Sequence, residues 1–294
     1  MSWLRVTLNI SRDEIENCEN LLLEQGAISV SLENNDSEVI LEPELGKTPF
    51  WKAVKLTALF ESSSNRRNLK KMLTNRYCSN TFNFELIDDK NWLDEHKKNY
   101  QAITFNNRLC ISPSWITPSK DVPATLKIDP GLAFGTGQHS TTSLCLERLS
   151  EISLGSKYIV DFGCGSGILA LAALKLNAKK ALGIDMDPQA LAASKRNAQI
   201  NSLDQSIELA LPEDSKVTDW LGKADIVIAN ILANPIKNLA TTLLKMLKPD
   251  GTLILSGILE TQASEIISHY HRLLPLEQKK TKNGWVLLQG KVDN

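Results

Sequence analysis

The sequence has few cysteines and histidines and no long apolar run. Its five cysteines are scattered over 294 residues, and there are four histidines. An odd, dispersed set of cysteines argues against a disulfide framework and against a zinc site. No apolar segment approaches the roughly 20 residues that span a bilayer, and the first residues alternate like a strand without a signal-peptide core. We therefore expect a soluble, cytoplasmic protein with no metal site and no membrane association.

Charge and complexity exclude further classes. The formal net charge is -1 at pH 7, which argues against dedicated nucleic-acid binding. The chain has no internal repeat and no low-complexity segment, and its hydrophobic fraction of 42% is ordinary for a globular protein. Its length suggests two domains, at roughly 100–200 residues each. We expect a monomer.

A glycine-rich turn is the most informative part of the chain. An apolar strand at residues 158–160 leads into Asp161, and a helix-forming run follows at residues 168–176. Between them, every second residue is a glycine: Gly163, Gly165 and Gly167. Glycine allows a tight turn and close approach of a ligand, and the start of a helix presents free N–H groups. The pattern predicts a nucleotide-type pocket at the carboxyl end of a strand.

The spacing of the glycines indicates which ligand this pocket takes. The dinucleotide fingerprint Gly-x-Gly-x-x-Gly needs a third glycine where this chain has Ile168. The carboxylate of Asp161 would disfavour a pyrophosphate but would attract an ammonium group. S-adenosylmethionine (SAM) carries an ammonium and no phosphate. We predict that Asp161, Gly163 and Gly165 bind SAM. A nicotinamide dehydrogenase is the less favoured alternative.

A second acid stands at the end of the next predicted strand. The apolar run at residues 181–184 ends in Asp185, whose carboxylate can accept hydrogen bonds from both ribose hydroxyls of a nucleoside. The same acid would suit NAD, so Asp185 alone does not discriminate between the two cofactors. Asp187 precedes Pro188 and is predicted to be a helix N-cap with proline at the first helical position.

An asparagine ends a third predicted strand. The buried run at residues 224–229 is followed by Asn230, Ile231 and Leu232. The side-chain oxygen of asparagine can accept a hydrogen bond from an amine, so we predict that Asn230 is catalytic and aligns a neutral amine with the methyl group. Many amino-methyltransferases have Asn-Pro-Pro-aromatic here. The missing aromatic favours an aliphatic amine over a nucleobase. The alternative is that Asn230 only closes a turn.

These segments together resemble a known family. With DPGLAFGTGQHSTT at residues 129–142, the segments DFGCGSG, GIDMDP and NILANP resemble the ribosomal protein L11 methyltransferases of the PrmA type, over most of residues 90–290. The resemblance implies a class I SAM-dependent enzyme that methylates lysine side chains and the N-terminal α-amine of ribosomal protein L11. It also implies SAM contacts at Thr142, Gly163, Asp185 and Asn230, although Thr141 could take the place of Thr142.

The resemblance and the pattern of elements give the expected architecture. Residues 1–88 read as strand-helix-strand-strand-helix-strand, the plan of a small α+β ferredoxin-like domain, which we assign to substrate recognition. Residues 89–124 form a connector with a short helix and a hairpin turning at Asn106-Asn107. Residues 125–294 form the SAM-dependent methyltransferase domain, a Rossmann-like, doubly wound α/β sheet with an antiparallel last strand.

Two questions stay open at this stage. The methyl acceptor could be another protein or a small amine, and a non-catalytic SAM-binding protein would share the same motifs. No strong general base stands in the motifs: His139, in the glycine-rich loop, is expected to be a hydrogen-bonding residue rather than a base.

Overall fold

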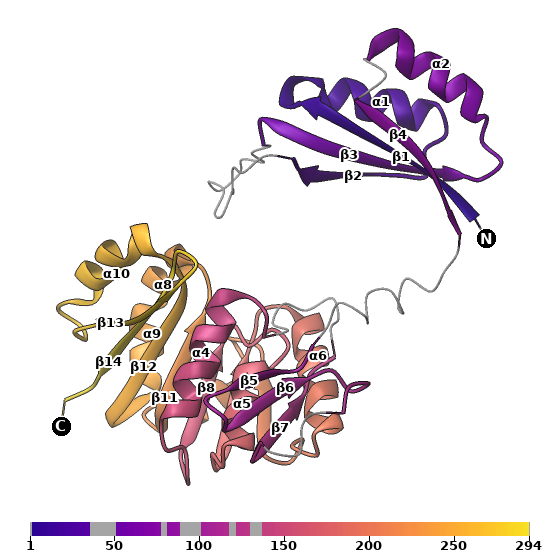
Figure 1. Cartoon of the computed structure of the whole chain (residues 1–294). Coiled ribbons are helices and arrows are strands. Elements are labelled where there is room, and N and C mark those ends of the chain that lie inside the picture. The colour runs from indigo at the N-terminus through magenta and orange to yellow at the C-terminus, as the bar shows by residue number, and fades with distance from the viewer. Residues whose placement is uncertain are drawn as a thin grey trace. The chain divides into compact units, whose positions relative to one another are not determined.

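The computed structural model describes residues 2–35, 51–77, 81–88, 101–117, 122–129 and 137–293. Their contacts divide the chain into two compact units, Met1–Asn99 and Tyr100–Asn294 (Figure 1). The helix expected at residues 90–100 and most of the glycine-rich loop that precedes residue 137 lie outside the described residues.

The first unit contains its elements in the expected order. They are β1 (Ser2–Ser11), the 3-10 turn η1 (Arg12–Glu14), α1 (Ile15–Glu24), β2 (Ser29–Asn34), β3 (Ala53–Glu61), α2 (Arg66–Arg76) and β4 (Phe82–Asp88). The strands form an antiparallel sheet in the order β2-β3-β1-β4.

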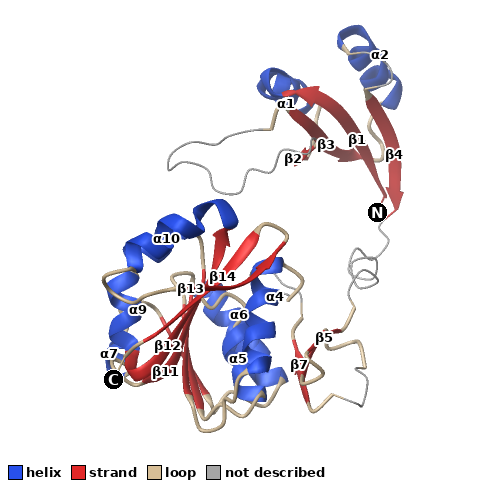
Figure 2. Cartoon of the chain, turned by 60° about the vertical axis from the view of Figure 1, so that its left-hand side comes forward, coloured by secondary structure: helices blue, strands red, loops and turns tan. Residues whose placement is uncertain are grey.

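One face of this sheet carries the core of the first unit. Alternation along β1 buries Leu4, Val6 and Leu8, because successive side chains of a strand point to opposite faces. These residues form one cluster with Leu22 of α1 and Leu73 of α2. Both helices therefore cover the same face, as Figure 2 shows.

Local signals mark the start of η1 and the end of α1. The backbone N–H of Ser11 donates to Glu14 Oε2 over 3.1 Å, within a capping box. Gly26, with φ of +90°, follows the helix in a left-handed conformation that glycine adopts readily.

The second unit is built on a seven-stranded sheet in the order β10-β9-β8-β11-β12-β14-β13. The strands are β8 (Tyr158–Phe162), β9 (Lys180–Ile184), β10 (Ile207–Ala210), β11 (Ala224–Asn230), β12 (Leu247–Leu259), β13 (Glu277–Lys282) and β14 (Trp285–Lys291). The first five pair in parallel, and β14 is antiparallel to both β12 and β13. The expected doubly wound sheet with an antiparallel last strand is confirmed.

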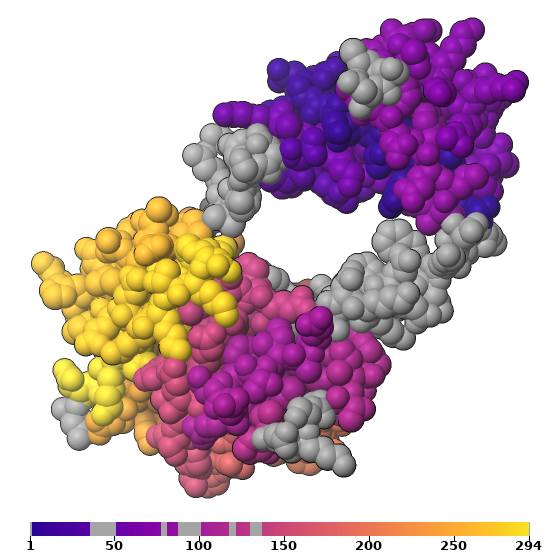
Figure 3. Space-filling model, in the orientation of Figure 1, coloured from indigo at the N-terminus to yellow at the C-terminus, as the bar shows by residue number. Residues whose placement is uncertain are grey.

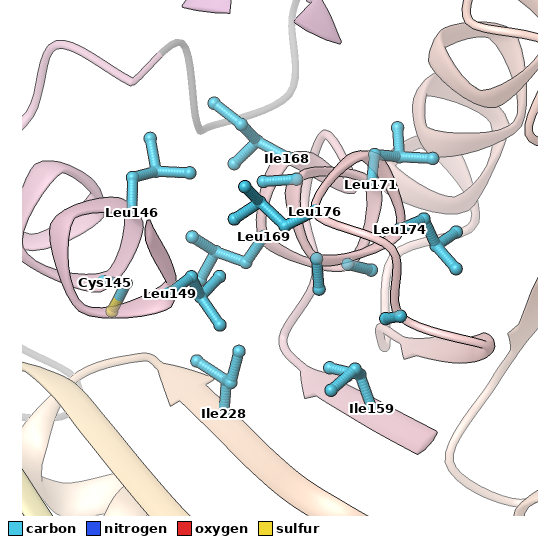
Figure 4. Packing of buried hydrophobic residues seen from close by; sticks show 14 of the residues in the cluster. Cys145, Leu146, Leu149, Ile159, Ile168, Leu169, Leu171, Leu174, Leu176 and Ile228 are labelled. Atoms are coloured by element: carbon cyan, nitrogen blue, oxygen red, sulfur yellow. The ribbon is translucent and has the colours of Figure 1, made fainter. Parts of the chain in front are cut away.

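Helices cover both faces of this sheet. They are α4 (Ser140–Glu151), α5 (Ile168–Lys175), α6 (Pro188–Ile200), α7 (Ser215–Asp219), α8 (Ala233–Asn238), α9 (Ala240–Met246), the 3-10 turn η2 (Glu260–Gln262) and α10 (Ala263–Tyr270). Figure 4 shows Leu149 of α4 and Leu169 of α5 packed over Ile159 and Ile228 of the sheet. On the other face, α8, α9 and α10 pack in a second cluster with Val160. Burial on both faces explains the apolar runs of these strands.

A three-stranded sheet precedes this core in the second unit. It consists of β5 (Ile103–Phe105), β6 (Leu109–Ser112) and β7 (Ala124–Lys127). The expected hairpin is confirmed: β5 and β6 are antiparallel, and Asn106 and Asn107 have φ of 48° and 52°, as its turn requires.

This hairpin packs with the second unit, although the sequence placed it in a connector. Phe105, Leu109 and Ile111 are buried in one cluster with α4 and α5. Strand β7, which the sequence analysis did not predict, pairs in parallel with β6. The prolines around residues 113–123 suggested a connector, but the apolar side chains of the hairpin pack into the core of the second unit.

Within the described ranges, no helix has the length and apolar character needed to cross a membrane. Four of the cysteines are described, and all four are free and buried: Cys18, Cys110, Cys145 and Cys164.

Candidate active site

The carboxyl ends of β8, β9 and β11 line a cavity of about 490 Å³. This volume lies in the range of small-molecule pockets. Most of its lining is apolar, including Phe162, Ile168, Leu169 and Ile231. Five of the six residues predicted to bind the cofactor also line it: Thr142, Gly163, Gly165, Asp185 and Asn230. The sixth, Asp161, is not among the lining residues.

The glycine turn needs its glycines. Gly163, Gly165 and Gly167 have φ of 76°, 54° and 77°, a region that other residues rarely adopt. A Cβ atom at Gly163 would lie 2.3 Å from Cγ2 of Ile231, and one at Gly167 would lie 2.8 Å from Oγ of Ser194. The turn is therefore packed tightly between the end of β11 and α6.

Backbone hydrogen bonds orient Asp185. Gly165 N donates to its Oδ2 over 2.8 Å, and Asp187 N donates to its Oδ1 over 3.0 Å. A carboxylate oxygen can accept more than one hydrogen bond, so both oxygens keep capacity for ribose hydroxyls. Asp187 itself caps α6, since its Oδ1 accepts from Gln189 N over 2.8 Å with Pro188 at the first turn. Its predicted capping role is confirmed.

The carboxamide of Asn230 has one occupied end and one open end. Its Nδ2 donates to Oγ1 of Thr142 over 3.2 Å. Its Oδ1 is buried and has no hydrogen-bond partner among the described residues. An unpaired buried acceptor costs roughly 1–3 kcal/mol, so this oxygen is suited to receive a donor from a bound molecule. Thr142 thus fixes Asn230 with its acceptor available at the cavity.

The start of α4 positions Thr142. His139 is the N-cap of α4: its Nδ1 accepts from Thr141 N over 3.4 Å and lies 2.8 Å from Thr141 Oγ1. Its ring also packs edge-to-face on Trp285, with centroids 5.3 Å apart. His139 is not among the residues that line the cavity. The structure gives it the hydrogen-bonding role expected from the sequence, and leaves Thr142 as the threonine that faces the cavity.

The C-terminal hairpin β13–β14 also holds the first turn of α4. Nζ of Lys282 donates to Oγ of Ser143 over 2.6 Å, and Nδ2 of Asn283 donates to Oγ of Ser140 over 3.0 Å. The space-filling view shows the hairpin, in yellow, beside the surface of the second unit that includes α4 (Figure 3).

Asp161 is buried behind the cavity, with 1% of its surface exposed. Its Oδ2 accepts from Ala170 N over 3.1 Å, which supplies a capping acceptor for α5 because the N-cap residue Gly167 has no side chain. Its Oδ1 has no partner among the described residues. Burial, assisted by the nearby charge of Asp185, raises the pKa of Asp161 to about 7. That Asp161 binds the ammonium group, directly or through water, stays a prediction.

Cys164 lies in the turn and lines the cavity, but its chemistry is that of an inert thiol. Burial, together with the charge of Asp161, raises its pKa far above the usual range. A nucleophilic thiol needs a lowered pKa.

A larger hollow, of about 660 Å³, lies at the amino ends of the same strands around Trp220. Its charged side chains are largely neutralised in place: Lys180 pairs with Glu208, and Lys248 pairs with Asp225. We therefore place the active site at the carboxyl ends. Among the described residues, no three His, Cys, Asp or Glu side chains come together as a metal site.

Gly257 of β12 is a site residue that the sequence analysis missed. It has φ of +82°, and a Cβ atom there would lie 2.2 Å from the backbone oxygen of Ile231. Ile231, directly after Asn230, therefore packs its side chain against Gly163 and its backbone against Gly257. A glycine inside the buried run of residues 252–259 was the available signal, because glycine in a strand interior often marks a close backbone approach.

These features fit SAM. The cavity offers a carboxylate oriented by backbone N–H groups, a turn of glycines without side chains, and a buried acceptor on Asn230 that has no partner among the described residues. Together with the parallel sheet and its antiparallel last strand, they define a class I SAM-dependent methyltransferase.

Comparisons with known proteins then give the family. Residues 2–293 match the family model described as ribosomal protein L11 methyltransferase (PrmA). The chain belongs to this family.

Two relatives match the chain over nearly its full length, and a solved structure matches two thirds of it. The chain is 42% identical to a ribosomal protein L11 methyltransferase of Shewanella sp. (strain ANA-3), over 99% of each chain. It is 41% identical to the protein of that name from Pasteurella multocida (strain Pm70), over 99% of this chain and 100% of the other. A crystal structure of ribosomal protein L11 methylase from Lactobacillus delbrueckii subsp. bulgaricus is 32% identical, with a TM-score of 0.58 over 66% of this chain and 100% of that chain.

The first prediction concerns the pH dependence of stability. In the folded protein Asp161 titrates at about 7, but near 3.9 in an unfolded chain. Between these values the folded state holds one more proton, so this group's contribution to stability falls by about 1.4 kcal/mol per pH unit as pH rises. Asp161→Asn removes that loss. Urea unfolding of the ligand-free proteins should show that the free energy of unfolding of the variant rises relative to that of the wild type from pH 5 to 7, with no further relative increase above pH 8.

The control for that experiment is the exposed Asp204→Asn, which removes one charge without touching the buried site. Parallel stability curves for Asp161→Asn and the wild type across this pH range would show that Asp161 is not a buried group with a raised pKa.

The second prediction concerns Gly257→Ala. The added methyl group must displace the Ile231 backbone, and with it Asn230. Misplacement of about 1 Å at a reacting centre can cost about 100-fold in rate, so kcat should fall on the order of 10-fold or more, and further than the affinity for SAM. Kinetics and calorimetry on the same preparation would compare the two. Gly155→Ala, where a Cβ meets nothing within 4 Å, is the control. A folded Gly257→Ala with unchanged kcat would refute the assignment.

Proposed function

We infer that this chain transfers methyl groups from SAM to amino groups of ribosomal protein L11, at lysine side chains and the N-terminal α-amine. The observation that carries the proposal is the Oδ1 of Asn230 at the end of β11, which is buried and has no partner in the part of the chain that the structure describes. This oxygen can accept a hydrogen bond from an amine that still carries its hydrogens while its lone pair attacks. The family membership of the whole chain supports the choice of substrate.

The chain's own residues act mainly by alignment. SAM, when bound, supplies an activated methyl group on a sulfonium, which is already a good leaving group. Asn230 orients the amine, and Thr142 holds the Asn230 carboxamide in place. Asp185 accepts hydrogen bonds from the ribose hydroxyls, and Gly163, without a side chain, leaves room for the cofactor beside Ile231. Proximity and orientation of this kind supply a large part of the barrier reduction in a two-substrate reaction.

The apolar surroundings of Asn230 suit an aliphatic amine. Ile231, Pro235 and Leu239 line the cavity on this side, and the segment directly after Asn230, residues 231–235, contains no aromatic side chain. A lysine stem can pack along such a surface while its amine reaches Asn230.

The remaining assignments belong to the same proposal. We assign substrate recognition to residues 1–88, since the candidate site described above lies in the second unit. We also propose a cytoplasmic location, where ribosomal proteins are available, a monomeric state, and no dedicated binding of nucleic acid or membranes.

Mass spectrometry tests the proposed function directly. Purified ribosomal protein L11, incubated with the chain and SAM carrying an isotope-labelled methyl group, should gain labelled methyls on amino groups. Asn230→Ala should bind SAM but transfer methyl groups at least about 10-fold more slowly. Binding of SAM without any transfer would indicate a non-catalytic protein, and labelling of other proteins or small amines in place of L11 would refute the substrate.

A pH profile tests how the amine loses its proton. Asn230 cannot take up a proton near neutrality, and His139 caps α4, so the proton should go largely to solvent. A lysine amine has an ordinary pKa of about 10.4. The logarithm of kcat/KM on lysine substrates should rise with a slope near one from about pH 6.5 to 9. An ascending limb near pH 6.5 that disappears in His139→Ala would contradict this and make His139 the base.

Truncation tests the role of the first unit. The fragment of residues 100–294 contains the whole described cavity and should bind SAM as the full chain does. We expect its kcat/KM on intact L11 to fall by at least about 10-fold, because recognition contacts are lost. An equal kcat/KM for the fragment and the full chain would remove the recognition role.

A further inference from the structure

Helix α6 and its C-cap present three polar side chains to the protein interior. Ser194, Asn197 and Asn201 are 0%, 5% and 7% exposed. Their spacing of three and four residues places them on one face of the helix. Buried polar groups must form hydrogen bonds to offset their lost hydration, so the partners of these three show what this face of α6 holds.

Two of the three form hydrogen bonds to the backbone of the glycine turn. Oγ of Ser194 donates to the backbone oxygen of Gly165 over 2.8 Å, and Nδ2 of Asn197 donates to the backbone oxygen of Ser166 over 2.8 Å. The third acts elsewhere, since the Asn201 carboxamide bonds both the N–H and the C=O of Lys127 in β7. Two consecutive carbonyls of the turn are thus fixed from α6.

The same glycine is held from its other side by the ribose-facing acid. Gly165 N donates to Oδ2 of Asp185 over 2.8 Å, while its carbonyl accepts from Ser194. A chain of hydrogen bonds therefore runs from Ser194 through Gly165 to Asp185. Removing the Ser194 hydroxyl would leave the Gly165 carbonyl without this buried partner and free the residue to rotate, which would also shift its N–H away from the carboxylate.

Packing also holds the turn against α6. A Cβ atom at Gly167 would lie 2.8 Å from Oγ and 3.1 Å from Cβ of Ser194, so this part of α6 is in direct contact with the turn. Because Ser194 is fully buried, solvent water does not reach this position to replace its hydroxyl as the donor to the Gly165 carbonyl.

We propose that Ser194 and Asn197 are positioning residues for SAM. Through the Gly165 and Ser166 carbonyls they set the glycine turn, and Ser194, through Gly165, also orients the Asp185 carboxylate. The inference rests on the proposed function for the identity of the ligand. It assigns these residues to cofactor affinity and not to the alignment of the amine, which depends on Asn230 and Thr142.

Calorimetry of SAM binding to the full chain, combined with kinetics, tests the proposal. Ser194→Ala should weaken SAM binding about 5- to 50-fold, as expected for a lost buried hydrogen bond. At saturating SAM, kcat should stay within about twofold, and KM for L11 should not change. A residue that only stabilised the fold would not produce this split. Asn197→Ala should also weaken SAM binding, and it provides the test if Ser194→Ala does not fold.

Two comparisons sharpen the test. Ser150→Ala, at a fully buried serine of α4 that bonds Glu147 and Asn106, should leave SAM affinity unchanged. In a protein that already carries Asp185→Ala, adding Ser194→Ala should lower the affinity for SAM much less than Ser194→Ala does alone. The reason is that the effects of contacts in one hydrogen-bond chain are not additive.

The outcomes separate this inference from the function it rests on. Wild-type SAM affinity in a folded Ser194→Ala or Asn197→Ala overturns the positioning role, as does full additivity with Asp185→Ala. Failure of the wild-type chain to bind SAM would instead overturn the proposed function.

Discussion

The Asn230 carboxamide forms a hydrogen bond to Thr142 through its nitrogen and leaves its oxygen unpaired among the described residues. The asparagine carboxamide carries a donor, Nδ2, and an acceptor, Oδ1, and a half-turn of the group would exchange their positions. Only the observed orientation places an acceptor where an amine could be aligned. The chemistry that we propose therefore depends on what fixes Thr142 and Asn230, and much of the second unit serves that end.

Each partner of this hydrogen bond is held by a separate part of the fold. Thr142 stands in the first turn of α4, which His139 caps and the β13–β14 hairpin ties down at Ser140 and Ser143. Asn230 ends β11, and the next residue, Ile231, packs its side chain against Gly163 and its backbone against Gly257. The strands beyond β11 thus do more than complete the fold, because β12 supplies the glycine behind Ile231 and the β13–β14 hairpin contacts α4.

The sequence was sufficient to predict the features that lie close together along the chain. An apolar run that stops at a polar residue marks each of three strand ends, at Asp161, Asp185 and Asn230. The glycines mark the turn through Gly165. Parallel strands bring such tips to one edge of a sheet, so their meeting could be inferred. The capping role of Asp187 follows from an equally local pattern.

Contacts between distant segments were not visible in the same way. A glycine at position 257 of an apolar run signals a close backbone approach, but nothing near it in sequence identifies Ile231 as the neighbour. Ser194 likewise reads as an ordinary helix residue until its bond to Gly165 is seen. The predicted role of Asp161 also gained a structural component, since its carboxylate caps α5 from a neighbouring strand. Strand β7 was missed because its pairing with β6 depends on partners outside its own short run.

The most direct measurement is the single-turnover rate of methyl transfer at saturating SAM for Thr142→Val and Thr142→Ser. Valine keeps the shape of threonine but has no oxygen to accept from Asn230, whereas serine keeps that acceptor. Our account predicts a rate close to wild type for Thr142→Ser and a loss of about 10-fold or more for Thr142→Val, because the carboxamide is then free to turn. Equal rates for the two variants would contradict it and show that the hydrogen bond to Thr142 does not govern the alignment of the amine.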